Sequence, residues 1–146
     1  MYRILSIFFI SILLLFSYNC KKAAESSNSF VGHWQGNAEV TTNGEAVLTA
    51  NVHANFTEDS YTINNEGKAK TGDGGECEVK VASEGSYTSD GTNLTIKPTK
   101  ETMSVCGKDI PTKLEPDTYK VSLEGDNLTL SLDEGDTKTI TTLKKQ

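Results

Sequence analysis

From Phe30 onward, the feature that most constrains the fold is an alternation of apolar and polar residues with a period of two. In one stretch the apolar members are Leu48, Ala50, Val52, Ala54 and Phe56. Because successive side chains of a strand point to opposite faces, this pattern predicts strands with one buried side and one side in water. The alternation returns in residues 76–81, 119–123 and 128–132, and no stretch after Phe30 shows a convincing helical repeat.

Short turn sequences that end in glycine separate the alternating runs. They are Asn43-Gly44, Glu66-Gly67, Asp90-Gly91, Glu124-Gly125 and Glu134-Gly135. Glycine readily adopts the positive φ that tight hairpin turns require. Residues 67–75 and 107–116 interrupt the pattern, and we expect them to form loops. The sequence therefore predicts an all-β domain over residues 30–146, a small up-and-down antiparallel meander barrel of about 8–10 strands.

A Gly-x-Trp motif, formed by Gly32 and Trp34, stands at the entry to the first predicted strand. This segment resembles the opening of a lipocalin-like domain. The resemblance implies that Gly32 and Trp34 plug one end of the barrel, beneath a basic side chain from the last strand. Lys138 or Lys144 stands where lipocalins usually have an arginine. Without the resemblance, Trp34 also fits a large core aromatic in some other β-barrel or sandwich.

The first nineteen residues have the pattern of an export signal. Met1-Tyr2-Arg3 gives a positive start, and the apolar run of residues 4–16 is shorter than the about 20 residues that a spanning helix needs. We predict a signal peptide over residues 1–19. The alternative is a short membrane anchor that is never cleaved.

One cysteine, Cys20, directly follows the apolar run. The segment of residues 15–20 resembles a bacterial lipoprotein signal of the looser, spirochaete type, with Tyr18 and Asn19 in place of small residues. The resemblance implies that the Cys20 thiol carries a diacylglycerol and that the new amino terminus is acylated, with fatty acyl chains such as palmitate. Two or more such chains hold a protein on a bilayer. We therefore expect a lipid-anchored protein of the cell envelope, in the outer membrane.

Residues 20–29 contain no large apolar side chain and are predicted to form a flexible, lipidated tether. The whole chain has 14 basic and 20 acidic residues; cleavage before Cys20 removes Arg3 and leaves 127 residues with a net charge of −7. An acidic chain repels polyanions, so we expect no nucleic-acid partner. We expect the mature protein to be a monomer.

The chain has three cysteines, and acylation of Cys20 would leave Cys77 and Cys106, 29 residues apart. An oxidising compartment outside the cytoplasm favours a disulfide between them. The alternative is two separately buried free thiols. No CxxC pair is present, which argues against thiol redox chemistry.

The predicted inward side chains bear on whether the barrel is hollow. Those that we expect to line a ligand cavity are Ala50, Val52, Ala54, Phe56, Val79 and Val81. They are small enough to leave a pocket and numerous enough to close a core, so the sequence alone leaves both possibilities open.

Residues for catalysis or metal binding are not arranged in any familiar motif. The two histidines, His33 and His53, are isolated, and the acidic turns at 73–76 and 133–136 lack the EF-hand spacing. We expect no enzyme, metal or cofactor. The leading hypothesis is a non-enzymatic envelope lipoprotein that binds a small apolar ligand, such as a fatty acid, inside its barrel. The alternative is a surface or periplasmic protein-interaction module, a host-factor binder or inhibitor, with a filled barrel.

Overall fold

The computed structural model describes residues 30–146, which form nine β-strands. Along the chain these are β1 (Gly32–Thr42), β2 (Glu45–Phe56), β3 (Ser60–Lys70), β4 (Glu76–Ser89), β5 (Asn93–Val105), β6 (Lys108–Ile110), β7 (Asp117–Glu124), β8 (Asn127–Glu134) and β9 (Thr137–Lys145). Within this part of the chain, no helix is long and apolar enough to cross a membrane. The predicted signal peptide, tether and Cys20 lie outside the described residues.

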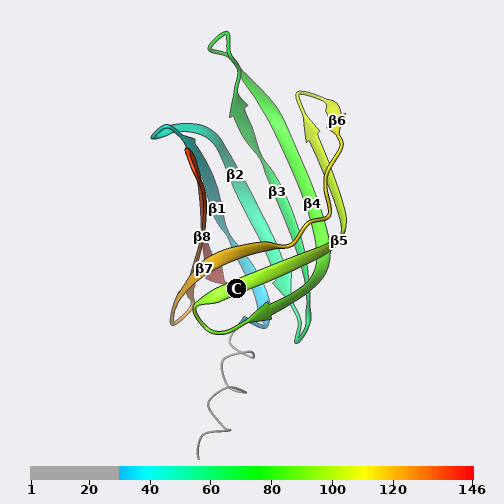
Figure 1. The fold of residues 1–146 in the computed structure, drawn as a ribbon, viewed down its shortest axis with the longest axis vertical. Coiled ribbons are helices and arrows are strands. Elements are labelled where there is room, and N and C mark those ends of the chain that lie inside the picture. Colours follow the sequence, from blue (N-terminus) through cyan, green and yellow to red (C-terminus); the bar gives the residue numbers. More distant parts are fainter. Residues whose placement is uncertain (1–29) are drawn as a thin grey trace, which may run out of the picture.

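Eight of the strands close into an up-and-down antiparallel barrel (Figure 1). Each of β1 to β4 pairs with the strand that follows it in the chain, and β9 returns to pair with β1. The short strand β6 pairs with the far end of β5 and takes no part in closing the ring. The all-β meander barrel predicted from the sequence is thus confirmed, with eight strands in the barrel and one beside it.

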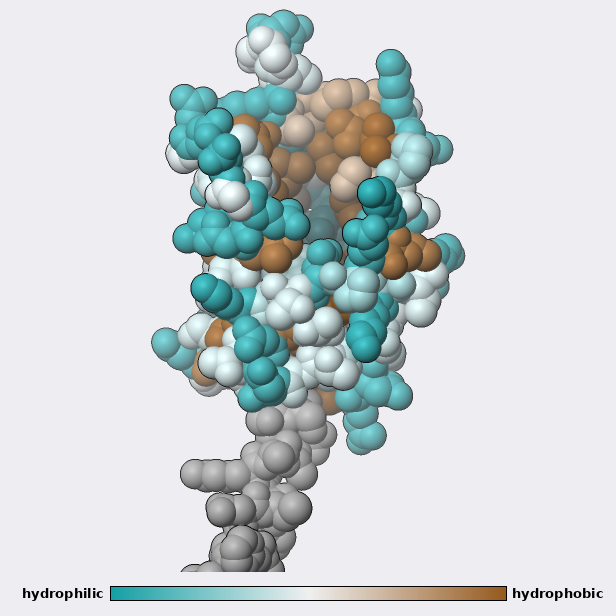
Figure 2. Space-filling view, in the orientation of Figure 1, coloured by the Kyte–Doolittle hydropathy of each residue, from teal (hydrophilic) through white to brown (hydrophobic). Residues whose placement is uncertain are grey.

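One side of the barrel wall is incomplete. Strand β7 pairs with β5 only between residues 93–96 and 117–120, while the far end of β5 pairs with β6 instead. The last residues of β8, from Leu132 to Glu134, pair with β9 alone. The upper half of the molecule is hollowed on this side, and hydrophobic side chains line the back of the hollow (Figure 2).

Two local predictions about turns and loops are wrong. The pair Glu66-Gly67 lies inside β3, where Gly67 faces Ala50 across the sheet. A Cβ at Gly67 would overlap the backbone of Thr49 and Ala50. The glycine therefore allows β2 and β3 to approach closely, and it does not form a turn. The two expected loops are also shorter than predicted, because residues 67–70 belong to β3 and Lys108–Ile110 forms β6. The other four glycine turns connect strands, each with its glycine at positive φ.

The best-packed part of the core lies at the end of the barrel where both β1 begins and β9 ends. Its fully buried large side chains are Phe30, Trp34, Phe56, Tyr61, Leu94, Leu128 and Leu143. The backbone amide of Gln146 donates to the carbonyl of His33 at 3.0 Å, which ties the two ends of the described chain together. This end is therefore closed, and the opposite end carries the β1–β2, β3–β4 and β8–β9 turns (Figure 1).

Candidate functional site: a cavity inside the barrel

Trp34 fills the closed end of the barrel and is 2% exposed. Its Nε1 donates to the carbonyl of Phe30 at 2.7 Å, so the indole is buried without losing its hydrogen bond. The ammonium of Lys145 lies 5.6 Å from the centre of the ring, within reach of a cation–π interaction. A Cβ at Gly32 would meet the Lys145 side chain at 2.8 Å, so glycine leaves room for the lysine stem.

The basic residue over Trp34 is neither of the two lysines named from the sequence. Lys145 is the register partner of Trp34 in the β1–β9 pair, whereas Lys144 faces Gln35 and Lys138 faces Thr41 near the other end. Alternate residues of a strand point to opposite faces, so Lys144 projects outward. The lysine that covers Trp34 is decided by the register between β1 and β9, which the sequence does not show.

Further aromatic side chains pack at the same closed end and, together with Trp34, form a floor. Phe56 and Tyr87 pack edge to face with their ring centres 5.2 Å apart, and Phe30 packs against Tyr87 at 6.5 Å in the same manner. The Tyr87 hydroxyl donates to the carbonyl of Thr57 at 2.7 Å. Phe56, which we expected to line a cavity, belongs to this floor and is not among the cavity-lining residues. The floor therefore bounds the interior space from below.

A cavity of about 250 Å³ occupies the interior above the floor. All eight barrel strands contribute to its lining. Five of the residues expected to line it are on its wall, namely Ala50, Val52, Ala54, Val79 and Val81. Most of the other lining residues are also apolar, including Leu94, Leu130 and Leu143. The barrel is therefore partly hollow, and its cavity is smaller than most ligand pockets.

Five polar residues interrupt the apolar lining: Asn65, Glu101, Tyr119, Thr139 and Thr141. The Oδ1 atom of Asn65 is buried and has no hydrogen-bond partner. Buried carbonyl oxygens normally have a partner, because an unpaired one costs about 1–3 kcal/mol. Asn65 thus holds one unpaired acceptor that is buried within the barrel wall.

A β-bulge in β5 determines that Glu101 lines the cavity. The register with β4 runs from Gly85 opposite Pro98 to Glu84 opposite Lys100, so Thr99 is the extra residue. In a regular strand that continued from Ile96, Lys100 would face inward; the extra residue reverses the alternation, and Glu101 faces inward instead. The exposures agree, since Lys100 and Thr102 are exposed whereas Glu101 and Met103 are partly buried.

Glu101 and Asn65 were not predicted from the sequence as cavity residues. A signal for Glu101 exists in β5, where the apolar residues change from the even positions of Leu94 and Ile96 to the odd positions of Met103 and Val105. Such a change of parity within one strand indicates a bulge. Asn65 has no comparable signal, because a single asparagine on the apolar face of a strand looks the same as one at a turn.

Titratable side chains near Glu101 shift one another's pKa values. Burial raises the pKa of Glu101, and the Asp117 carboxylate raises it further, against a hydrogen bond from Ser83 that lowers it. Burial also raises the pKa of Asp117, with Glu134 and Glu115 adding to the effect. Burial raises the pKa of the Tyr119 hydroxyl, and Asp117 and Glu101 contribute to that rise. The wall around Glu101 is therefore a partly buried region of negative potential.

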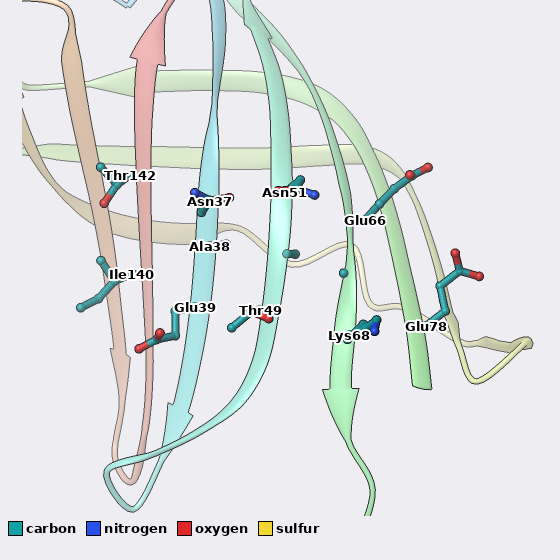
Figure 3. A pocket seen from close by; sticks show the side chains of 12 residues that line it. Asn37, Ala38, Glu39, Thr49, Asn51, Glu66, Lys68, Glu78, Ile140 and Thr142 are labelled. Carbon is teal, nitrogen blue, oxygen red and sulfur yellow. The ribbon is translucent and has the colours of Figure 1, made fainter. Parts of the chain in front are cut away.

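A larger but shallower hollow lies on the outer face of β9, β1, β2, β3 and β4 (Figure 3). Its side chains form rows across the strands, such as Thr142, Asn37, Asn51 and Glu66, which are consecutive register partners. They spread along the curved sheet and do not converge on one point (Figure 3). This surface has the polar character of an ordinary solvated face, so the interior cavity is the better candidate site.

The disulfide between Cys77 and Cys106 is present in the structure. Cys77 lies in β4, and Cys106 lies in the turn between β5 and β6. The amide of Cys106 also donates to the carbonyl of Glu78 at 2.9 Å. The bond therefore links β4 and β5 near the open end of the barrel, away from the aromatic floor.

The histidines do not join any cluster. His33 and His53 are both exposed on the outer face of their strands. Among residues 30–146, no group of three or more histidine, cysteine or acidic side chains is arranged to hold a metal ion.

Comparison with known proteins identifies the family. The model of the lipocalin-like domain matches residues 30–110, more than half of the chain. No curated protein shows significant similarity to the chain. The matched region ends at β6, and the structure shows that β7, β8 and β9 complete the barrel begun by the matched strands. Proteins of this kind are usually non-enzymatic binders. The chain belongs to the lipocalin-like domain family.

Proposed function

We propose that the chain is a non-enzymatic, membrane-anchored lipoprotein of the cell envelope that binds a small apolar ligand inside its barrel. The observation that carries the proposal is the cavity, which has a closed aromatic floor, apolar walls from eight strands and an opening beside β8. Burying apolar ligand surface there supplies about 25 cal/mol per Å². No metal or chemical step is needed for such binding.

The volume of the cavity limits the size of the ligand. An apolar protein cavity of about 150 Å³ binds benzene. In proportion, a cavity of about 250 Å³ accepts roughly ten non-hydrogen atoms, for example an aromatic ring with a short side chain. A long-chain fatty acid exceeds this volume, so it would fit only with much of its chain outside.

The first test compares two tryptophan substitutions at neighbouring positions of β4. Val81 lines the cavity, whereas Ala82 is exposed on the outer face. We expect Val81→Trp to fill the cavity and to lower the affinity for 2-phenylethanol, a neutral probe of suitable size, at least ten-fold. Ala82→Trp, the matched control, should retain wild-type affinity in isothermal titration calorimetry.

The rival function is a protein-interaction module. Two large apolar side chains favour it, because Ile110 is 41% exposed and Leu114 is 52% exposed, on β6 and on the connection to β7. If the wild-type chain binds no small apolar probe, or if both tryptophan variants bind it equally well, the ligand-binding proposal is overturned. The same exposed residues would then be the first to substitute in a search for a protein partner.

The proposed anchor sets how the domain faces the membrane. A lipid on Cys20 would join the barrel through residues 21–29, which precede Phe30 at the closed end. The open end lies opposite, so the cavity would face away from the bilayer (Figure 1). The spirochaete-type signal and the outer-membrane location remain part of this proposal and rest on the amino-terminal sequence.

A further inference from the structure

The Glu101 carboxylate is the one polar side-chain group among the described residues lining the cavity that can only accept hydrogen bonds. The other polar side chains of the lining also have donors, since Asn65 has an amide NH2 and Tyr119, Thr139 and Thr141 have hydroxyls. The unpaired Oδ1 of Asn65 is buried and leaves no surface for a ligand to contact.

The Glu101 carboxylate stands in a polar part of the cavity wall. Glu101 is opposite Ser83 on β4, and Asn65 is opposite Val81 on the other edge of β4. Both residues line the cavity.

No cationic side chain balances the Glu101 carboxylate among the described residues that line the cavity. Lys100, next to Glu101 in the chain, is exposed because the bulge at Thr99 directs it outward. Lys145 lies over Trp34 at the closed end and does not line the cavity. A ligand carboxylate would therefore enter a site that already holds a carboxylate and offers it no positive partner, which is unfavourable in a poorly hydrated interior.

From this arrangement we infer that the cavity selects a small apolar amine, bound with its ammonium group at Glu101 and its apolar part against the aliphatic wall. The inference rests on the proposed ligand-binding function and specifies the class of ligand for the same cavity. An ammonium group brings both a positive charge and N–H donors, which match the charge and the acceptor oxygens of the Glu101 carboxylate. Charge-assisted hydrogen bonds of this type are among the strongest that proteins form.

The experiment compares three probes that share a phenyl ring and a short chain but differ in the terminal group: 2-phenylethylamine, 2-phenylethanol and 3-phenylpropionate. The full chain with Cys20→Ala is titrated with each at pH 7.5 by calorimetry, so that no acyl chain competes for the cavity. We expect the amine to bind at least ten-fold more tightly than the alcohol, and the carboxylate to bind more weakly than the alcohol.

Two substitutions then assign the preference to Glu101. Glu101→Gln, which keeps the shape and removes the charge, should lower amine affinity at least ten-fold and leave alcohol affinity within about three-fold. Lys100→Gln, the outward-facing control, should leave the ranking of the three probes unchanged. If Glu101→Gln fails to fold, the ranking measured on the unsubstituted cavity still decides the matter.

The outcomes separate the two proposals. Alcohol binding equal to or tighter than amine binding, or carboxylate binding tighter than both, overturns the inference about amines while the small-ligand function stands. Tight amine binding that survives Glu101→Gln unchanged also overturns it. Failure of all three probes to bind overturns both the inference and the ligand-binding function.

Discussion

At the scale of single residues, the plug formed by the Gly-x-Trp motif also depends on a side chain of the last strand. Gly32 lacks a Cβ, so the Lys145 side chain can cross over it and cover Trp34. The sequence correctly indicated Gly32 and Trp34 as neighbours at the entry to the first strand. It could not identify Lys145. Which lysine of the last strand faces Trp34 depends on the register between β1 and β9, and Lys145 lies 111 positions after Trp34.

Lys145 and Lys144 provide a matched pair for testing the plug. We expect Lys145→Met to lower the free energy of unfolding by about 0.5–1 kcal/mol, because it removes the cation over Trp34 but retains a similar apolar stem. Lys144→Met, on the outer face, should change it by less than about 0.5 kcal/mol. Urea denaturation monitored by the fluorescence of the single tryptophan measures both, and equal effects of the two substitutions would contradict the assignment.

At the scale of elements, β5 carries most of what the sequence could not predict. It pairs with three strands, β4 on one side and β7 and then β6 on the other. The extra residue Thr99 reverses its inside and outside faces partway along. Alternation predicted the strands with regular pairing well, since Val52 and Val79 lie where expected, but it assumes an unbroken period. A bulge breaks that period, so alternation did not place Glu101 in the cavity.

The disulfide between β4 and the turn after β5 should stabilise the barrel appreciably. Its cysteines are 29 residues apart, and in the chain-entropy model cross-linking such a loop contributes about 3.5 kcal/mol. We expect Cys77→Ser with Cys106→Ser to lower the free energy of unfolding by up to about that amount. Thiol labelling of the unfolded, unreduced wild-type domain should be near zero, and two reactive thiols there would contradict the bond.

At the scale of the whole molecule, the opening at the side follows from the way β7 divides its pairing between two neighbours. Its first residues pair with β5 and its last residues pair with β8, so Leu132–Glu134 of β8 have no residues of β7 beside them. The sequence predicted the barrel and its approximate strand number from alternation and turns. The opening could not be predicted, because it depends on which strands become neighbours.

The anchor is tested on the full chain in its own membrane. If Cys20 carries the lipid, Cys20→Ser should move the protein from the membrane fraction to the soluble envelope fraction, because the remaining tether has no large apolar side chain. Replacement of Lys21 and Lys22 by glutamine should leave the fractionation unchanged, since two exposed charges add only about 1 kcal/mol each. Continued membrane retention of Cys20→Ser would instead support an uncleaved anchor.

The opening beside β8 has a consequence for association between molecules. From Leu132 to Glu134 the outer edge of β8 has no strand beside it, and free backbone groups on such an edge are a template for pairing with a second chain. Asp133 and Glu134, both exposed, carry negative charge at this point. Two copies that approached edge to edge would bring these carboxylates together, so the entrance for a ligand is protected from becoming a site of aggregation.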